Sequence, residues 1–563
     1  MEAPQPMVGV LDERPDSTGR RATRETTRPW VRVIAVVLPA LVALILGAWR
    51  ITVPSLWRDE SFSGVMARMP LSYVRRLIAD VDAVHVTYYL LLRPFAAIAQ
   101  NELMLRLPSL LAFATTAFGV AVIGRRLAGP LAGCCGGLVY ALLPLADRYA
   151  QEARSYAIVS AAAVLSTWLL LRTLEGAQTR WHFAYAASVA LLGWLHLYSL
   201  LLLAAHLAGV LAARPARPLP WLFSVAAGGV LITPLVIVAA GQRDEQLFWL
   251  KSPGVADLAG LPAEITGGTA AAVLLLVLAA AGAWWSRRAL LVTAWPVLPV
   301  LASFLISQEY PVYHPRYVLY AIPGLALLAG IGVQAVTGAI RPATARVSVA
   351  AGAIVLLGAL AAPAQAAIRL PDSRPDDLRT LAAVLTQQER PGDRVLFVPR
   401  RYRLFVSVYG QPYRRLVDLT NAPGVYEPRT AAEFTAAAAG VHRIWLISPR
   451  LSERYMSDPR LQVLRRGFVA GATRTFGSVR LTPYTPRGAA RAHANARVKV
   501  SGTSGTGQAT PADAGTVSGV QRAGLDSTQV RGRAVRRATG WSRRGSSARG
   551  AGRGCARAVR RRG

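Results

Sequence analysis

The stretch WVRVIAVVLPALVALILGAW, residues 30–49, decides the class of fold. Its only charged residue is Arg32, and its length matches the roughly 20 apolar residues that a helix needs to cross about 30 Å of bilayer hydrocarbon. Comparable apolar runs follow near residues 84–100, 104–123, 127–146, 154–172, 183–212, 221–240, 269–285, 289–307, 317–338 and 347–367. The sequence therefore predicts an α-helical polytopic protein of the cell membrane with about 11 to 13 transmembrane helices.

The composition supports the membrane class. Of the 563 residues, 53% are hydrophobic, which is more than a protein with a fully solvated surface normally carries. The formal net charge is +34, from 64 basic and 30 acidic residues, but much of the excess lies in an Arg-rich C-terminal tail and the rest is scattered at the ends of apolar runs. Scattered basic residues suit contact with anionic membrane lipids and argue against a nucleic-acid-binding surface.

The N-terminal arm sets the expected orientation in the membrane. Residues 1–29 are polar and lack a signal-peptide pattern. Arginines cluster before the first span, at Arg20, Arg21, Arg24, Arg28 and Arg32. By the positive-inside rule we expect this arm to lie, disordered, in the cytoplasm. The stretch from His182 to Ala213 is long enough for one tilted helix or two short ones, so the side of the membrane reached after Ala367 depends on how that stretch folds.

The last third of the chain differs from the membrane part, residues 30–368. Charged residues return at residue 369, and short β-prone runs such as VLFV (395–398) and IWLI (444–447) alternate with helical segments. We predict a small soluble α/β domain over residues 369–486 and expect it on the extracytoplasmic side. Residues 487–563 lack hydrophobic periodicity, so we predict a disordered Arg-rich tail there.

The loop 50–84 is the longest polar segment of the membrane part, and with the N-terminus inside it faces the outside. It contains SLWRDESFSGVMARMP (55–70), in which Asp59 and Glu60 come shortly after the first span. At such an interface a carboxylate can deprotonate an acceptor hydroxyl as a general base. The same pair could instead cap a short helix that opens at Ser61. These residues alone leave both interpretations open.

Two more polar groups lie close to the next spans. Asp82 and His85 occur in DVDAVHVTYY (80–89), at the mouth of a span, and Arg106 follows Glu102 at the start of another. A single histidine in this position is usually an interfacial residue with a hydrogen bond, and the neighbouring acid favours a functional role only modestly. Ionisable side chains at a membrane boundary are costly unless they are solvated or paired.

The remaining candidates come from two motifs at later span boundaries. Arg154 and Tyr156 end the run DRYAQEARSY (147–156), at the head of an apolar helix. Arg316 and Tyr317 end EYPVYHPRY (309–317), where the planar guanidinium could bind a phosphate and the phenol could add a hydroxyl. The alternative is an aromatic interfacial belt with an arginine that extends toward the headgroups.

The order of these blocks resembles the type-C glycosyltransferases of family 39, which include protein O-mannosyltransferases and the aminoarabinose transferase of lipid A. The blocks are LWRDE, DVDAVH with YY, ELMLRLPSLLAFATTAFGVAVIGRRLAG, DRYAQEARSYAI and HPRYVLYAIPG. The resemblance covers about residues 30–340, and LRLPSLL and QEARSYA are its most specific parts. It implies a membrane glycosyltransferase that moves a sugar from a polyprenyl phosphate to a cell-envelope protein, lipid or glycan on the outer face. GC-rich coding would suit an actinobacterial source and mannose as the sugar.

The resemblance also implies roles for the candidate residues. Asp59 would be the catalytic base, with Glu60 beside it shaping the acceptor site. The candidates for binding the substrate or organising the donor phosphate are Asp82, His85, Arg106, Arg154, Tyr156, Arg316 and Tyr317. Polyprenyl phosphate is a leaving group whose charge arginines can stabilise in the transition state. The motif requires no metal, so no cofactor is expected, although a related type-C branch uses one.

Two other classes of function compete with this interpretation. A transporter or flippase of lipids or small molecules would be expected to show inverted repeats and broken helices with charges near the bilayer midplane. The sequence shows no such repeat, and its ionisable residues lie at span ends. A non-catalytic scaffold for cell-wall assembly would leave the matched arginines without a role.

Overall fold

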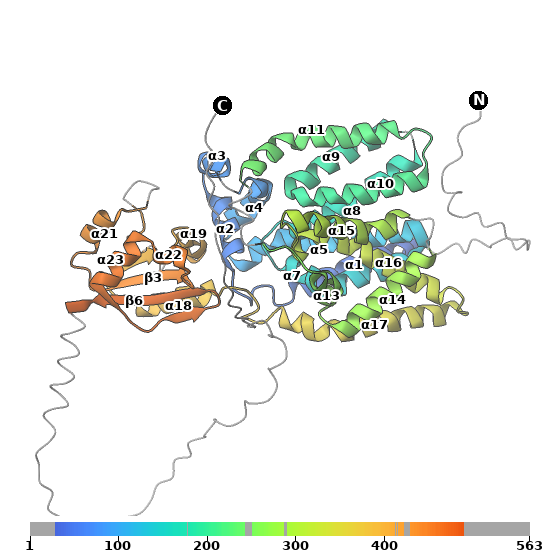
Figure 1. Cartoon of the computed structure of the whole chain (residues 1–563). Coiled ribbons are helices and arrows are strands. Elements are labelled where there is room, and N and C mark those ends of the chain that lie inside the picture. The colour runs from blue at the N-terminus through green and yellow to red at the C-terminus, as the bar shows by residue number, and fades with distance from the viewer. Residues whose placement is uncertain are drawn as a thin grey trace, which may run out of the picture. The chain divides into compact units, whose positions relative to one another are not determined.

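The computed structural model describes residues 29–80, 82–176, 178–242, 250–285, 290–410, 413, 415–421 and 428–488 (Figure 1). Nearly all of the predicted N-terminal arm and of the predicted Arg-rich tail lie outside these residues. The described residues belong to one structural unit, which consists of a helical membrane part and a smaller domain built around a β-sheet.

Long apolar helices make up most of the membrane part, because an α-helix satisfies its backbone polar groups within its own segment, where the hydrocarbon offers no water. Seven single spans are α1 (Pro29–Ala48), α5 (Glu102–Ala128), α8 (Tyr156–Glu175), α11 (Leu219–Gly241), α15 (Leu290–Glu309), η4 with α16 (Pro315–Thr337) and α17 (Ala343–Ala367). Two bent pairs are α6 (Pro130–Leu142) with α7 (Pro144–Ala150) and α13 (Val255–Thr266) with α14 (Thr269–Trp285). The described residues thus contain seven spans, or up to nine if each bent pair is one span, and the multi-pass membrane class is confirmed.

The span count is lower than the predicted 11 to 13 partly because one long apolar stretch is divided. The stretch from His182 to Ala213 forms two short helices, α9 (Thr179–Leu195) and α10 (Leu202–Ala213), joined by the 3-10 helix η3 (Leu197–Leu201). The α-helix ends at His196, whose backbone is extended. The break contains His196, Tyr198 and Ser199, but apolar residues on both sides keep the hydropathy of the whole stretch high, so a span-length average does not locate the break.

The predicted outer loop is itself largely helical. It contains the helices α2 and α3 and the 3-10 helix η2, and α2 packs against α4, the helix that follows the loop. Their bounds are α2 (Arg58–Arg68), α3 (Leu71–Asp80), η2 (Ala83–His85) and α4 (Val86–Ile98). With only 13 residues, α4 is too short for a full span, although the run near 84–100 was predicted to be one.

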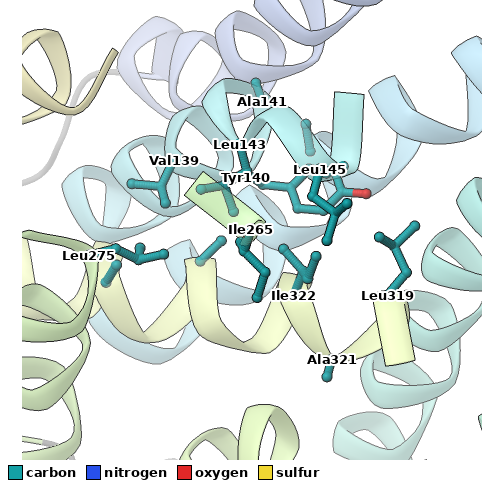
Figure 2. Packing of buried hydrophobic residues seen from close by; sticks show 14 of the residues in the cluster. Val139, Tyr140, Ala141, Leu143, Leu145, Ile265, Leu275, Leu319, Ala321 and Ile322 are labelled. Atoms are coloured by element: carbon teal, nitrogen blue, oxygen red, sulfur yellow. The ribbon is translucent and has the colours of Figure 1, made fainter. Parts of the chain in front are cut away.

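Small residues allow the central helices of the membrane part to pack closely. Helix α16 (Ile322–Thr337) packs against both α6 and α14. A Cβ atom at Gly330 would collide with the carbonyl of Ala132, and one at Gly332 would collide with the carbonyl of Leu278. Figure 2 shows part of the resulting core, with the buried side chains Val139, Tyr140, Leu145, Ile265, Leu275, Leu319 and Ile322.

The C-terminal domain contains a six-stranded mixed sheet with the path β2-β1-β3-β6-β4, and β5 pairs with β6. Strand β1 is parallel to β2 and β3, whereas β6 is antiparallel to β3, β4 and β5. The strands are β1 (Arg394–Phe397), β2 (Val417–Asp418), β3 (Ile444–Pro449), β4 (Phe468–Ala470), β5 (Arg474–Phe476) and β6 (Val479–Pro486). The first three residues of VLFV lie in β1 and the whole of IWLI lies in β3, so both predicted strands are confirmed.

Helices cover both faces of this sheet. Alternate side chains of a strand point to opposite faces, so Val395 and Phe397 pack with α18 and α19, whereas Leu396 and Val398 pack with α21 and α23. Strands buried on both faces read as continuous hydrophobic runs, which explains VLFV and IWLI. The helices of the domain are α18 (Leu378–Gln388), α19 (Tyr402–Val406), η5 (Ser407–Tyr409), α21 (Ala431–Ala438), α22 (Glu453–Met456) and α23 (Pro459–Gly467).

Candidate functional site

The first turn of α2 carries the predicted acidic pair. The helix begins at Arg58, and both carboxylates lie where negative charge complements the helix dipole. Their surroundings differ: the side chain of Asp59 is 27% exposed, whereas that of Glu60 is completely buried. Only Asp59 can therefore meet a substrate without a rearrangement of α2.

Glu60 forms a buried ion pair with Arg106. The Arg106 Nε and Nη2 atoms donate to the two carboxylate oxygens of Glu60 at 2.7 and 2.8 Å. Its other hydrogen bonds go to the carbonyl oxygens of Ile51, Pro54 and Ser55, at 2.6 to 3.1 Å. A guanidinium has five N–H donors, and all five are used here. Arg106 therefore holds the segment between α1 and α2 and keeps no donor for a phosphate.

A second chain of polar contacts links Arg154 to Asp82. The Arg154 Nη2 atom lies 2.6 Å from His85 Nε2, and because arginine can only donate, His85 accepts there and carries its proton on Nδ1. His85 Nδ1 lies 2.7 Å from Asp82 Oδ1, and Tyr89 donates to the other oxygen. Burial alone would raise the pKa of Asp82, but the charges and hydrogen bonds around it, mainly from His85, lower that pKa overall. An ionised Asp82 thus orients His85 toward Arg154.

Arg316 lies next to Asp59, although the two are 257 residues apart in the sequence (316 minus 59). Its Nη1 atom is 3.8 Å from Asp59 Oδ2. The guanidinium carbon lies 5.2 Å from the centre of the Tyr317 ring and 5.9 Å from that of Tyr156, within the range of cation–π attraction. A cation flanked by two aromatic rings therefore stands beside the accessible carboxylate.

The aromatic surroundings of Tyr317 include residues that the sequence analysis missed. Ring centres of His196, Tyr198 and His314 lie 5.2, 5.8 and 5.7 Å from that of Tyr317. The break between α9 and α10 brings His196 and Tyr198 to this place. Two polar aromatic residues within an otherwise apolar stretch were the available signal.

A second residue that was not singled out is Glu152, in the QEARSYA block. Its side chain is buried, and neither carboxylate oxygen has a hydrogen-bond partner in the described part of the chain. Burial raises the pKa of Glu152; Arg148 offsets this in part, and the like charge of Glu60 raises it further. The backbone of the same segment is well anchored, since Ala153 N donates to Glu60 Oε1 at 2.9 Å.

The structure thus brings the sequence-predicted residues together from four separate segments. Asp59, Arg154 and Tyr156 lie within electrostatic range of one another. The connected group consists of Asp59, Asp82, His85, Arg154, Tyr156, Arg316 and Tyr317. Glu60 and Arg106 adjoin this group as its buried support. Among the described residues, no three His, Cys, Asp or Glu side chains gather as the ligands of a metal ion would.

Comparison with solved structures finds proteins of similar fold. ArnT from Cupriavidus metallidurans matches in its apo crystal structure with a TM-score of 0.53, at 14% sequence identity over 80% of this chain and 97% of that one. Its complex with undecaprenyl phosphate matches with a TM-score of 0.52, at the same identity and coverage. The chain therefore shares the fold of ArnT. No protein-family model and no curated protein sequence matches the chain.

Within this fold, three spans begin at the site. Arg106 lies in the second turn of α5, while Tyr156 opens α8 and Arg316 stands at the start of η4. Helix N-termini carry a partial positive charge and unsatisfied N–H groups. The arrangement thus concentrates positive potential around the partly exposed Asp59, as the binding of an anionic group would require.

Proposed function

We propose that the protein is a polyprenyl-phosphate-sugar-dependent glycosyltransferase of family 39, which transfers mannose or a similar sugar to a cell-envelope protein, lipid or glycan on the outer face of the membrane. The observation that carries this proposal is the partly exposed Asp59 carboxylate 3.8 Å from the Arg316 guanidinium. A potential base thus stands beside a cation suited to a phosphate. The undecaprenyl phosphate bound to ArnT, which has the same fold, supports a polyprenyl phosphate as the donor lipid.

In this mechanism Asp59 takes the proton of an acceptor hydroxyl as the oxygen attacks the anomeric carbon of the sugar. The bond between that carbon and the phosphate oxygen breaks, its electron pair leaves with polyprenyl phosphate, and the configuration is inverted. Arg316 and Arg154 stabilise the negative charge that develops on the leaving phosphate. The phenol rings of Tyr156 and Tyr317 hold Arg316 in place.

The remaining predicted residues act through these groups. Asp82 and His85 fix the position of Arg154 through the hydrogen-bonded chain that connects them. Arg106 acts as a positioning residue, because its donors are all used by Glu60 and by carbonyl oxygens next to α2. Glu60 shares that role and supports the helix turn that presents Asp59.

The test is sugar transfer by the purified Asp59→Asn variant, given radiolabelled polyprenyl-phosphate mannose and cell-envelope fractions. The amide keeps the shape of the side chain but cannot take a proton, so we expect a loss of roughly 10²- to 10⁴-fold in kcat. Asp372→Asn, which changes an exposed carboxylate, is the matched control and should transfer at the wild-type rate.

Two results would contradict the proposal. Undiminished transfer by the Asp59→Asn variant would remove Asp59 as the base. Absence of transfer by the wild type to every envelope fraction, with several polyprenyl-phosphate sugars, would favour a transporter or a scaffold.

A further inference from the structure

A tyrosine of the C-terminal domain reaches the segment that leads into α2. The Tyr409 hydroxyl accepts from Leu56 N at 3.0 Å, lies 3.3 Å from Ser55 Oγ and donates to Glu102 Oε1 at 2.6 Å. Burial and the neighbouring Glu102 raise the pKa of Tyr409, so its hydroxyl keeps the proton that it donates. This one hydroxyl therefore connects the domain, the α1–α2 segment and the start of α5.

Arg379 of α18 binds the same segment and donates to the same Glu102 oxygen as Tyr409. Its Nη2 atom donates to Glu102 Oε1 at 2.6 Å and to the carbonyl oxygen of Thr52 at 2.7 Å. Its backbone N–H donates to Ser55 Oγ at 3.0 Å. The residues just before α2 are thus held by two side chains of the C-terminal domain.

The N-terminus of α2 is itself capped by the domain. Asp376 Oδ2 accepts from the backbone N–H of Arg58 at 3.1 Å and from its Nε atom at 2.9 Å. The Asp376 carboxylate is completely buried and also accepts from Ser478, which directly precedes β6. A carboxylate at a helix N-terminus stabilises the first turn, and this turn contains Asp59.

Apolar contacts extend the attachment along α2. The rings of Phe62 and Phe405 meet edge to face with their centres 6.1 Å apart. Val408 belongs to the same buried cluster as Leu56 and Val65. The domain therefore contacts α2 at its first turn and along one face, and it also contacts the segment that precedes α2.

We propose that the C-terminal domain is a positioning component of the catalytic centre, in which Tyr409 and Asp376 hold the first turn of α2 so that Asp59 faces Arg316. This proposal rests on the function proposed above. It assigns the domain a part in catalysis, and it makes Tyr409 and Asp376 positioning residues, which act through the backbone N–H groups of Leu56 and Arg58. The domain would then set kcat without providing a reacting group.

The test is Tyr409→Phe in the full-length protein, which removes the hydroxyl and keeps the ring. We expect kcat to fall roughly tenfold, because a small displacement of a reacting group is costly, while the KM for the polyprenyl-phosphate sugar changes less than about twofold. Amide hydrogen exchange over residues 56–64 should be at least about tenfold faster than in the wild type. Asp376→Asn should show the same two effects.

Tyr455→Phe is the matched control, because the Tyr455 hydroxyl accepts from Arg401 at 3.0 Å elsewhere in the domain. It should leave kcat and the exchange of residues 56–64 unchanged. The proposal is overturned if exchange of residues 56–64 in Tyr409→Phe equals the wild-type exchange, or if Tyr455→Phe lowers kcat as strongly. Hydrogen exchange needs no substrate, so it tests the contacts of the domain with α2 even if the wild type shows no transfer.

Discussion

Asp59 and Glu60 are adjacent acids with opposite surroundings, because successive residues of an α-helix project about 100° apart. The Glu60 side chain points toward Arg106 and is fully buried, while the Asp59 side chain is partly exposed and faces Arg316. Substitution of either partner of this buried ion pair should lower the stability of the protein by about 3–5 kcal/mol, because the other charge is then left buried and unpaired. Residue identity alone therefore could not show which of the two acids is buried in an ion pair and which is accessible.

Glu152 is the buried acid whose replacement should stabilise the protein. Its folded-state pKa lies above the ordinary value of 4.5, so the native state keeps the proton to higher pH than the unfolded chain does. The wild type therefore loses stability relative to Glu152→Gln as the pH rises from the ordinary value through the raised one. In detergent, we expect the melting temperature of Glu152→Gln to exceed that of the wild type by about 2–4 °C at pH 8 and by less at pH 4.5.

The exposed Glu453 of α22 provides the control for this measurement. Glu453→Gln should follow the wild-type melting temperature at both pH values. A Glu152→Gln protein that melts below the wild type at pH 8 would show that the Arg148 and Arg374 charges outweigh the burial of Glu152.

At the scale of elements, the central helices depend on glycines where backbones meet. Helix α16 approaches α6 so closely that a Cβ at Gly330 would overlap Ala132 O and the backbone of Gly136. These obstacles are backbone atoms, which cannot rotate away as a side chain can. The same α16 follows η4, which carries Arg316. Packing of α6 against α16 thus helps to fix the position of η4, which directly precedes α16 and carries the Arg316 guanidinium.

Gly330→Ala should therefore destabilise the protein by about 1–3 kcal/mol through overpacking. Gly352→Ala in α17 is the matched control, because a Cβ there meets open space and alanine favours the helix by about 0.5–1 kcal/mol. Thermal unfolding of both variants in detergent measures the difference. Equal melting temperatures would contradict close backbone packing at Gly330.

At the scale of the whole molecule, a buried arginine joins the end of α17 to the membrane part. Arg369 Nη2 lies 2.5 Å from Asp147 Oδ2 and 2.7 Å from the carbonyl oxygen of Leu46. Its Nε atom donates to the carbonyl oxygen of Trp49 at 3.0 Å. The chain is thus anchored just before it enters the C-terminal domain, and the contacts of Tyr409 require that domain and α2 to lie on one side of the membrane.

Cysteine labelling tests this shared side. In a chain whose Cys134, Cys135 and Cys555 are replaced by alanine, single cysteines at the exposed positions Arg68 and Arg400 report on α2 and on the domain. Because the arginine-rich arm is expected in the cytoplasm, a membrane-impermeant maleimide added to intact cells should label both. Labelling of one position alone would contradict the contacts between α2 and the domain, and labelling of neither would place the site in the cytoplasm.

The sequence by itself determined the membrane class, the strands β1 and β3, and which ionisable residues lie at the ends of the spans, because apolar runs and the ionisable residues that end them are local signals. Only the tertiary structure decided how these residues combine. Contacts between distant segments use all five Arg106 donors, bring Arg316 beside Asp59 and join Tyr409 to the segment before α2. The break at His196 likewise became visible only in the structure. Such contacts depend on how helices pack, and no local pattern in the sequence records them.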